Sequence, residues 1–151
     1  MKRARLLNAT STKNEQMSNT SPLPRKLAKE RLSTLASITR KLHRAIESWE
    51  VEDELQTLWE MGDHGDLDAF TLFGLALLME DKGWYDLEEG KLVLENAAES
   101  GSAMAQYYLG RFYLEGRSDL PVDPINGRYW IQQAAVQGYR QALDYMDERW
   151  R

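Results

Sequence analysis

The stretch AAESGSAMAQYYLGRFYLEG, residues 97–116, occurs again in weaker form on both sides of itself. Upstream, MGDHGDLDAFTLFGLALLME (61–80) matches it at a shift of 36 residues, and downstream AAVQGYRQALDYM (134–146) matches at a shift of 37. The segments between these copies follow the same period, since Asp86 lies opposite Asp123. Self-similarity at this period is typical of stacked helical repeats.

Each period divides into two helices. Residues 102–115 carry an apolar stripe that Gly116 ends, and the next helix begins at Asp123–Pro124, an N-cap acceptor followed by a proline at the first helical position. Asp86 begins the corresponding upstream helix, with Glu89 three residues on. No segment alternates with period two, so we expect no strands. The predicted fold class is all-α, an α-α solenoid of about two and a half helix pairs.

The first third of the chain differs from the repeats. Residues 1–21 are polar and have no apolar period, so they are expected to be a disordered tail. Residues 22–50 are expected to form a long, basic amphipathic helix, helical over 25–49, that caps a repeat domain at 51–151. The apolar stripe of this helix consists of Leu32, Leu35, Leu42, Ile46 and Trp49.

Residues 97–138 contain, in this order, AAESG, Ala105, Leu109-Gly110, Tyr113, Gly116, Asp123, Trp130 and AAVQG. This order resembles the Sel-one-like repeat family, a relative of the tetratricopeptide repeat with a slightly longer unit. The similarity extends over about residues 52–151 and implies a protein-binding scaffold that is not an enzyme. Gly90 and Gly127 stand where the family commonly has alanine, which costs each helix about 1 kcal/mol in propensity.

Composition and charge disfavour several classes of protein. The chain has no cysteine, so a disulfide framework is excluded and a reducing cytoplasm is expected. The basic start leads into no apolar signal region, and the apolar stretch 72–79 is far shorter than the roughly 20 residues that span a bilayer. Residues 1–49 carry 11 Lys/Arg against 3 Asp/Glu, a balance of +8, and residues 50–151 carry 8 against 21, a balance of −13. The acidic body disfavours nucleic acid as a partner.

The side of each first helix that does not pack on its partner helix is expected to bind another protein. Two interpretations of its apolar first unit stay open: a groove that takes a partner's helix or peptide, or a surface covered by the chain's own helix 25–49. That helix is also a candidate for mediating a homodimer. The expected partner-binding residues are Asp68, Leu72, Leu75, Met79, Met104, Tyr108, Arg111, Glu115, Gln141 and Tyr145.

Catalytic, metal and cofactor motifs are not expected. Asp63, His64, Asp66 and Asp68 include metal-ligand types, but they align with an ordinary turn between repeats, which predicts a solvated helix start. Phosphate-binding glycine loops, HExxH and nucleophile motifs do not occur. The expected function is a cytoplasmic adaptor of bacterial type. The alternative is an immunity or antitoxin protein whose acidic body neutralises a basic toxin.

Overall fold

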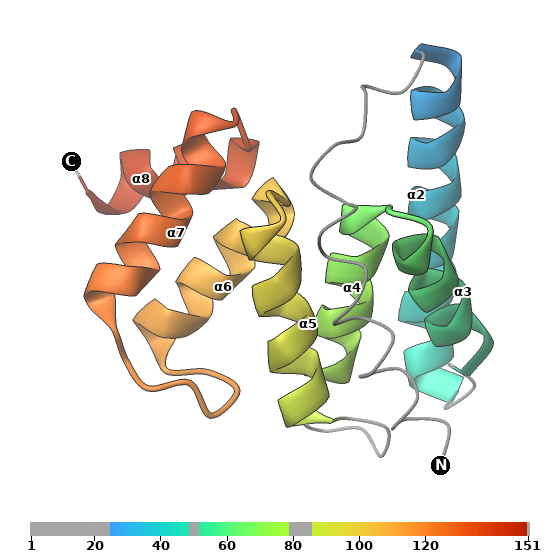
Figure 1. Ribbon diagram of the computed structural model, residues 1–151, viewed down its shortest axis with the longest axis horizontal. Helices are drawn as coiled ribbons and strands as arrows, with labels where there is room; N and C mark the ends of the chain where they lie inside the picture. Colours follow the sequence, from blue (N-terminus) through green and yellow to red (C-terminus); the bar gives the residue numbers. More distant parts are fainter. Residues whose placement is uncertain (1–24, 49–51, 79–85, 151) are drawn as a thin grey trace.

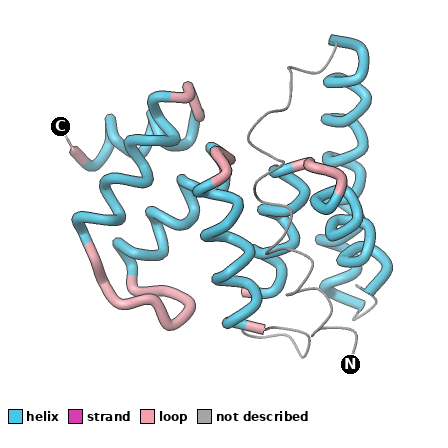
Figure 2. Tube along the Cα trace, viewed as in Figure 1, coloured by secondary structure: helices cyan, strands magenta, loops and turns pink. Residues whose placement is uncertain are grey.

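The computed structural model describes residues 25–48, 52–78 and 86–150. Within these ranges the protein is all-α, and Figure 2 shows helices joined by loops, with no strand in the described part. The prediction of an all-α fold is confirmed, whereas the expected tail at 1–21 lies outside the described residues. In chain order (Figure 1), the helices are α2 (Arg25–Ser48), α3 (Glu52–Asp63), α4 (Leu67–Leu77), α5 (Leu87–Glu99), α6 (Ala103–Glu115), α7 (Pro124–Val136) and α8 (Arg140–Arg149).

Helix starts recur at the period seen in the sequence. Asp66 and Ser102 precede α4 and α6, and their side chains accept from the N–H three residues on, at 3.0 and 3.1 Å. Asp86 and Asp123 cap α5 and α7 in the same way, each at 3.1 Å. A cap of this kind typically contributes about 1 kcal/mol. The starts predicted at Asp86 and at Asp123–Pro124 are therefore confirmed.

One turn geometry joins helices at three places. Gly65, Gly101 and Gly138 have φ angles of 96°, 97° and 79°, in the left-handed region that glycine adopts without a Cβ clash. The residue after each glycine donates its N–H to the carbonyl five positions earlier, which closes the C-terminal end of the preceding helix. These bonds measure 3.0 Å for Asp66 to Met61, 2.9 Å for Ser102 to Ala97 and 3.0 Å for Tyr139 to Ala134.

Glycines at repeated positions bring the two helices of a pair close together. A Cβ atom on Gly90 of α5 would lie 3.1 Å from the carbonyl oxygen of Gly74 on α4, and 2.8 Å from the side chain of Leu78. Gly110 and Gly127 repeat this contact between α6 and α7. Gly90 and Gly127 therefore lie where a methyl group has little room. Glycine lowers the helix propensity at these positions, but it allows the two helices to cross closely.

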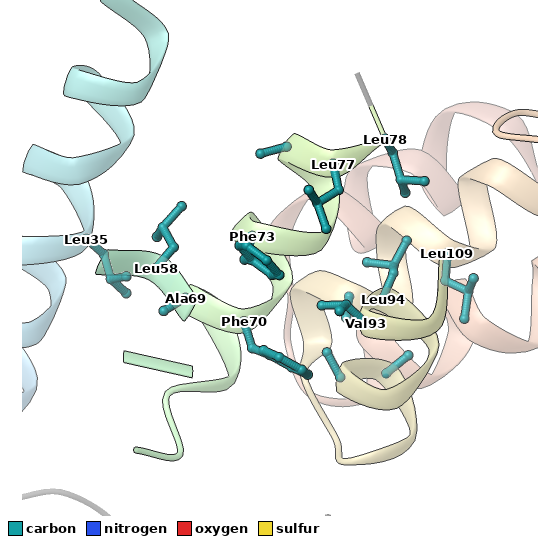
Figure 3. Packing of buried hydrophobic residues seen from close by; sticks show 14 of the residues in the cluster. Leu35, Leu58, Ala69, Phe70, Phe73, Leu77, Leu78, Val93, Leu94 and Leu109 are labelled. Atoms are coloured by element: carbon teal, nitrogen blue, oxygen red, sulfur yellow. The ribbon is translucent and has the colours of Figure 1, made fainter. Parts of the chain in front are cut away.

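A hydrophobic core runs along the helix array. Figure 3 shows Leu58 of α3, Phe73 of α4 and Leu94 of α5 in the large cluster, which extends to Leu109 of α6. Leu58 and Leu94 are 0% exposed, and burying a leucine contributes roughly 1.5–3 kcal/mol. A second cluster from α6, α7 and α8 contains Tyr107, Ile131, Ala134 and Ala142.

Helix α2 lies against α3 at one end of the array (Figure 1). Its Leu35 and Ile38 are each 7% exposed and belong to the large cluster. Leu32, which was expected in the same apolar stripe, is 58% exposed, so that part of the prediction is wrong: α2 buries a narrower side than its sequence indicated. The predicted burial of Leu42, Ile46 and Trp49 stays a prediction, because the structure does not describe the side chains of Leu42 and Ile46, and Trp49 lies outside the described ranges. No helix in the described ranges is long and apolar enough to cross a membrane.

Candidate functional site

Four tyrosines lie close together, two on α6, one on α8 and one at the residue that precedes α8. Tyr107 and Tyr108 of α6 have ring centroids 5.3 Å apart at 71°. The ring of Tyr139, which precedes α8, lies 5.5 Å from that of Tyr107, and the ring of Tyr145 on α8 lies 6.4 Å from it at 78°. Edge-to-face pairs of this kind contribute about 0.5–1.5 kcal/mol beyond the area that they bury.

Arg111 completes this group. Its Nη1 donates to the phenol oxygen of Tyr107 at 3.0 Å, and its Nε donates to Glu115 at 2.6 Å. Its guanidinium carbon lies 5.8 Å from the ring centroid of Tyr107 and 5.2 Å from that of Tyr145. A cation over two rings and beside a carboxylate is held in one orientation. We call Tyr107, Tyr108, Arg111, Tyr139 and Tyr145 the Tyr–Arg cluster.

Tyr139 stands at the position where the other turns place a capping residue. Asp66, Ser102 and Tyr139 follow one another at shifts of 36 and 37, yet Tyr139 makes no side-chain cap bond at the start of α8. Its ring lies on Tyr107 instead. Burial, followed by the proximity of Tyr108, Asp68 and Tyr107, raises the pKa of Tyr139 to about 12. The phenol therefore keeps its proton, and its capacity to donate a hydrogen bond, at all physiological pH values.

Asp68 is engaged by the chain's own helix α2. Arg31 Nη2 donates to Asp68 Oδ2 at 2.9 Å, and the Nε and Nη2 atoms of Arg31 also reach Asp66, at 2.5 and 2.8 Å. Asp66 caps α4 at the same time. These hydrogen bonds, that to Asp66 above all, raise the pKa of Arg31, which stays charged. One arginine thus ties α2 to the start of α4.

The other predicted partner-binding residues are only partly assembled. Leu72 and Leu75 are half-buried and pack against the large core cluster, to which Leu35 and Ile38 of α2 also belong. Tyr108, Arg111, Glu115 and Tyr145 do come together. Met104 is half-buried, Gln141 is exposed, and Met79 lies outside the described residues.

Sequence reasoning missed three aromatic residues of this region. Tyr107 is 8% exposed and was not assigned to the binding face, although it lies four residues before Arg111 and hence on the same side of the helix. Tyr139 could have been found because it departs from the capping residues at its repeat position. Trp150, with its ring 5.8 Å from that of Tyr145 at 88°, lies just after α8.

Three of the possible metal ligands near the start of α4 make contacts within the protein. Asp66 caps the helix and binds Arg31, Asp68 binds Arg31, and the Nδ1 atom of His64 lies 2.7 Å from the carbonyl oxygen of Glu60. The described ranges contain no group of three or more His, Cys, Asp or Glu side chains that could hold a metal ion.

Comparison of the chain with protein-family models, with curated proteins and with solved structures gave no match.

Proposed function

We propose that the chain is a non-enzymatic, cytoplasmic adaptor built as a solenoid of Sel-one-like repeats, and that it binds a partner protein or peptide through the Tyr–Arg cluster. The observation that carries this proposal is that four tyrosines and one arginine from α6, from α8 and from the residue before α8 lie in contact. Tyrosine and arginine are among the residue types most enriched at binding hot spots.

The side chains of the Tyr–Arg cluster are held in fixed orientations, which supports a role in binding a partner. Arg111 is held by Glu115 and Tyr107, so little side-chain entropy is lost when a partner contacts it. Tyr108, Tyr139 and Tyr145 are half-buried, with apolar ring surface beside a polar hydroxyl. A partner could therefore bury ring surface and form hydrogen bonds in one contact.

Equivalent geometry at successive repeats supports the solenoid. The N–H of Asp86 donates to the carbonyl of Leu77 at 2.9 Å, and the N–H of Asp123 donates to the carbonyl of Tyr113 at 2.8 Å. Together with the recurring turns and glycine contacts, these bonds give consecutive helix pairs the same internal arrangement. Stacked pairs of this kind present extended binding surfaces.

Affinity capture from native cytoplasm tests the adaptor function. Wild type is compared with Arg111→Ala and Tyr145→Ala, and with Leu92→Ala as a control at an exposed position of α5, away from the cluster. We expect both cluster variants to lose the same captured protein, with at least a roughly tenfold drop, while the control retains it. Retention of every captured protein by both folded cluster variants would contradict the proposal.

The runner-up is an inhibitor that neutralises a basic toxin. The observation that favours it is the crowding of acidic groups on α5: burial and the neighbouring charge of Glu99 raise the pKa of Glu95, and Glu88 adds to this effect. An inhibitor of this class should associate rapidly, with a rate that falls steeply as salt is added. An association rate that is nearly independent of salt would favour the adaptor.

A further inference from the structure

The outer side of α7 is apolar where the equivalent side of α5 is acidic. Ile125, Tyr129, Gln132 and Val136 follow one another along α7 at helical spacing, and a shift of 37 residues places them opposite Glu88, Leu92, Glu95 and Glu99 of α5. Ile125, Tyr129 and Val136 are 82%, 49% and 84% exposed. On this side α5 thus carries three glutamates and one exposed leucine, whereas α7 carries three exposed apolar residues and one glutamine. Exposed apolar residues that lie together are typical of interaction surfaces.

A groove lies between the apolar end of α7 and helix α8. It has a volume of about 740 Å³. On α8 its wall includes Leu143, which is 42% exposed and lies opposite Gln106 of α6 in the repeat. Gln106 is 6% exposed and is contacted by Gln137, which follows α7. The lining residues are Gln132, Gln133, Ala135, Val136, Arg140, Leu143, Asp144, Met146 and Asp147.

The charges along α8 indicate what occupies the groove. Arg140 and Asp147 lie seven residues, or about 10 Å, apart on one side of the helix, with Leu143 between them. Two such helices laid antiparallel place each Arg140 opposite the other copy's Asp147 and bring the two Leu143 side chains near the axis. Arg140 already pairs with Asp144 of its own helix at 2.9 Å, so the second carboxylate extends an existing ion pair. The groove is therefore complementary in charge to itself.

We propose that α7 and α8 form a two-fold interface with a second copy of this chain, in which the α8 helices lie antiparallel and fill each other's grooves. Interfaces in which the same surface serves both subunits are the commonest in soluble oligomers. Tyr145 lies two residues from Leu143, about 200° around the helix, so the Tyr–Arg cluster faces away from this interface. The dimer presents two clusters, and the inference does not depend on their proposed function.

Sedimentation velocity and light scattering on the full chain test the interface. From a chain mass of 17.5 kDa, we expect a wild-type particle of 2 × 17.5 = 35 kDa. Leu143→Glu should weaken the dimer at least about tenfold. The matched control Leu92→Glu, at a position 40% exposed on α5, should leave the mass unchanged, and far-ultraviolet circular dichroism verifies that each variant is folded.

Charge exchange makes the test specific. Arg140→Asp alone and Asp147→Arg alone should each weaken the dimer, because each places like charges opposite one another. The double variant carrying both changes should recover it. A wild type that stays at 17.5 kDa at every concentration overturns the proposal. A double variant that dimerises no more tightly than the two single variants also overturns it. A dimer that survives Leu143→Glu but dissociates with Leu32→Glu would assign association to α2 and also overturn it.

Discussion

Gly110 and Gly127 meet where α6 crosses α7: a Cβ atom on Gly110 would lie 2.7 Å from the carbonyl oxygen of Gly127. It would also lie 2.7 Å from Cγ1 of Ile131, whose side chain is fully buried. The obstacle is in part backbone, which cannot move aside as a flexible side chain can. This contact sets how closely the helices of the best-matching repeat approach.

Gly110→Ala should therefore destabilise the protein, although alanine is the better helix former by about 1 kcal/mol. Overpacking typically costs 1–3 kcal/mol, so we expect a net loss of about 1–2 kcal/mol in the free energy of unfolding, measured by urea denaturation. Gly74→Ala is the matched comparison, because its closest obstacle is the Val93 side chain at 2.9 Å. It should cost less. A Gly110→Ala protein more stable than wild type would show that the helices cross further apart.

Arg31→Ala should loosen α2. The change removes hydrogen bonds to Asp66, which caps α4, and to Asp68 of α4, and bonds to charged partners contribute roughly 1.5–3 kcal/mol when buried. Because 27% of the Arg31 side chain is exposed, we expect about 1 kcal/mol, together with faster amide hydrogen exchange in α2.

Two further variants separate the roles of the carboxylates. Asp66→Ala should cost more than Asp68→Ala, because Asp66 also caps α4. Lys41→Ala, at an exposed position of α2, is the control and should change neither stability nor exchange. If Arg31→Ala leaves amide hydrogen exchange in α2 unchanged, Arg31 does not hold α2 against the start of α4.

Tyr139 should make stability fall at high pH. Its pKa is about 12 in the folded protein, against the ordinary tyrosine value of 10.0, so between these pH values the folded state holds a proton that the unfolded chain has lost. The free energy of unfolding should therefore decrease as pH rises from about 10 to 12. Tyr139→Phe should make this decrease smaller, as measured by denaturant titrations across that pH range.

Tyr129→Phe, at an exposed tyrosine of α7, is the control for this pH experiment. The ultraviolet absorbance of phenolate in the folded protein offers a direct measurement, because the latest-titrating phenol should disappear in Tyr139→Phe. If that phenol remains, Tyr139 does not occupy its half-buried position beside Tyr107.

Much of the helical framework could be predicted, because its signals are local. The caps Asp86 and Asp123 bond to N–H groups three residues away, and Gly101 and Gly138 adopt left-handed backbone within their own turns. Such interactions join neighbours in the chain, and a repeat displays them more than once. The assignment of Leu32 to the buried side of α2 failed because burial depends on where α3 lies.

The candidate site could be predicted only in part. Tyr108, Arg111 and Tyr145 follow from the spacing of a helix face, and they do come together. The ion pair between Arg31 and Asp68 joins residues 37 positions apart, so the spacing of neighbouring residues does not predict it. The ring of Tyr139 on Tyr107 likewise depends on how α8 is placed against α6.

By itself, the sequence determined the all-α class, the helix starts and the turns, because caps and left-handed glycines act over three to five residues of chain. Only the tertiary structure decided that Gly110 faces Gly127, that Arg31 joins α2 to α4 and that Tyr139 completes the Tyr–Arg cluster. These contacts depend on the relative placement of whole helices. That placement is set by how buried side chains fill space, and one helix's sequence does not encode the volume its neighbour leaves.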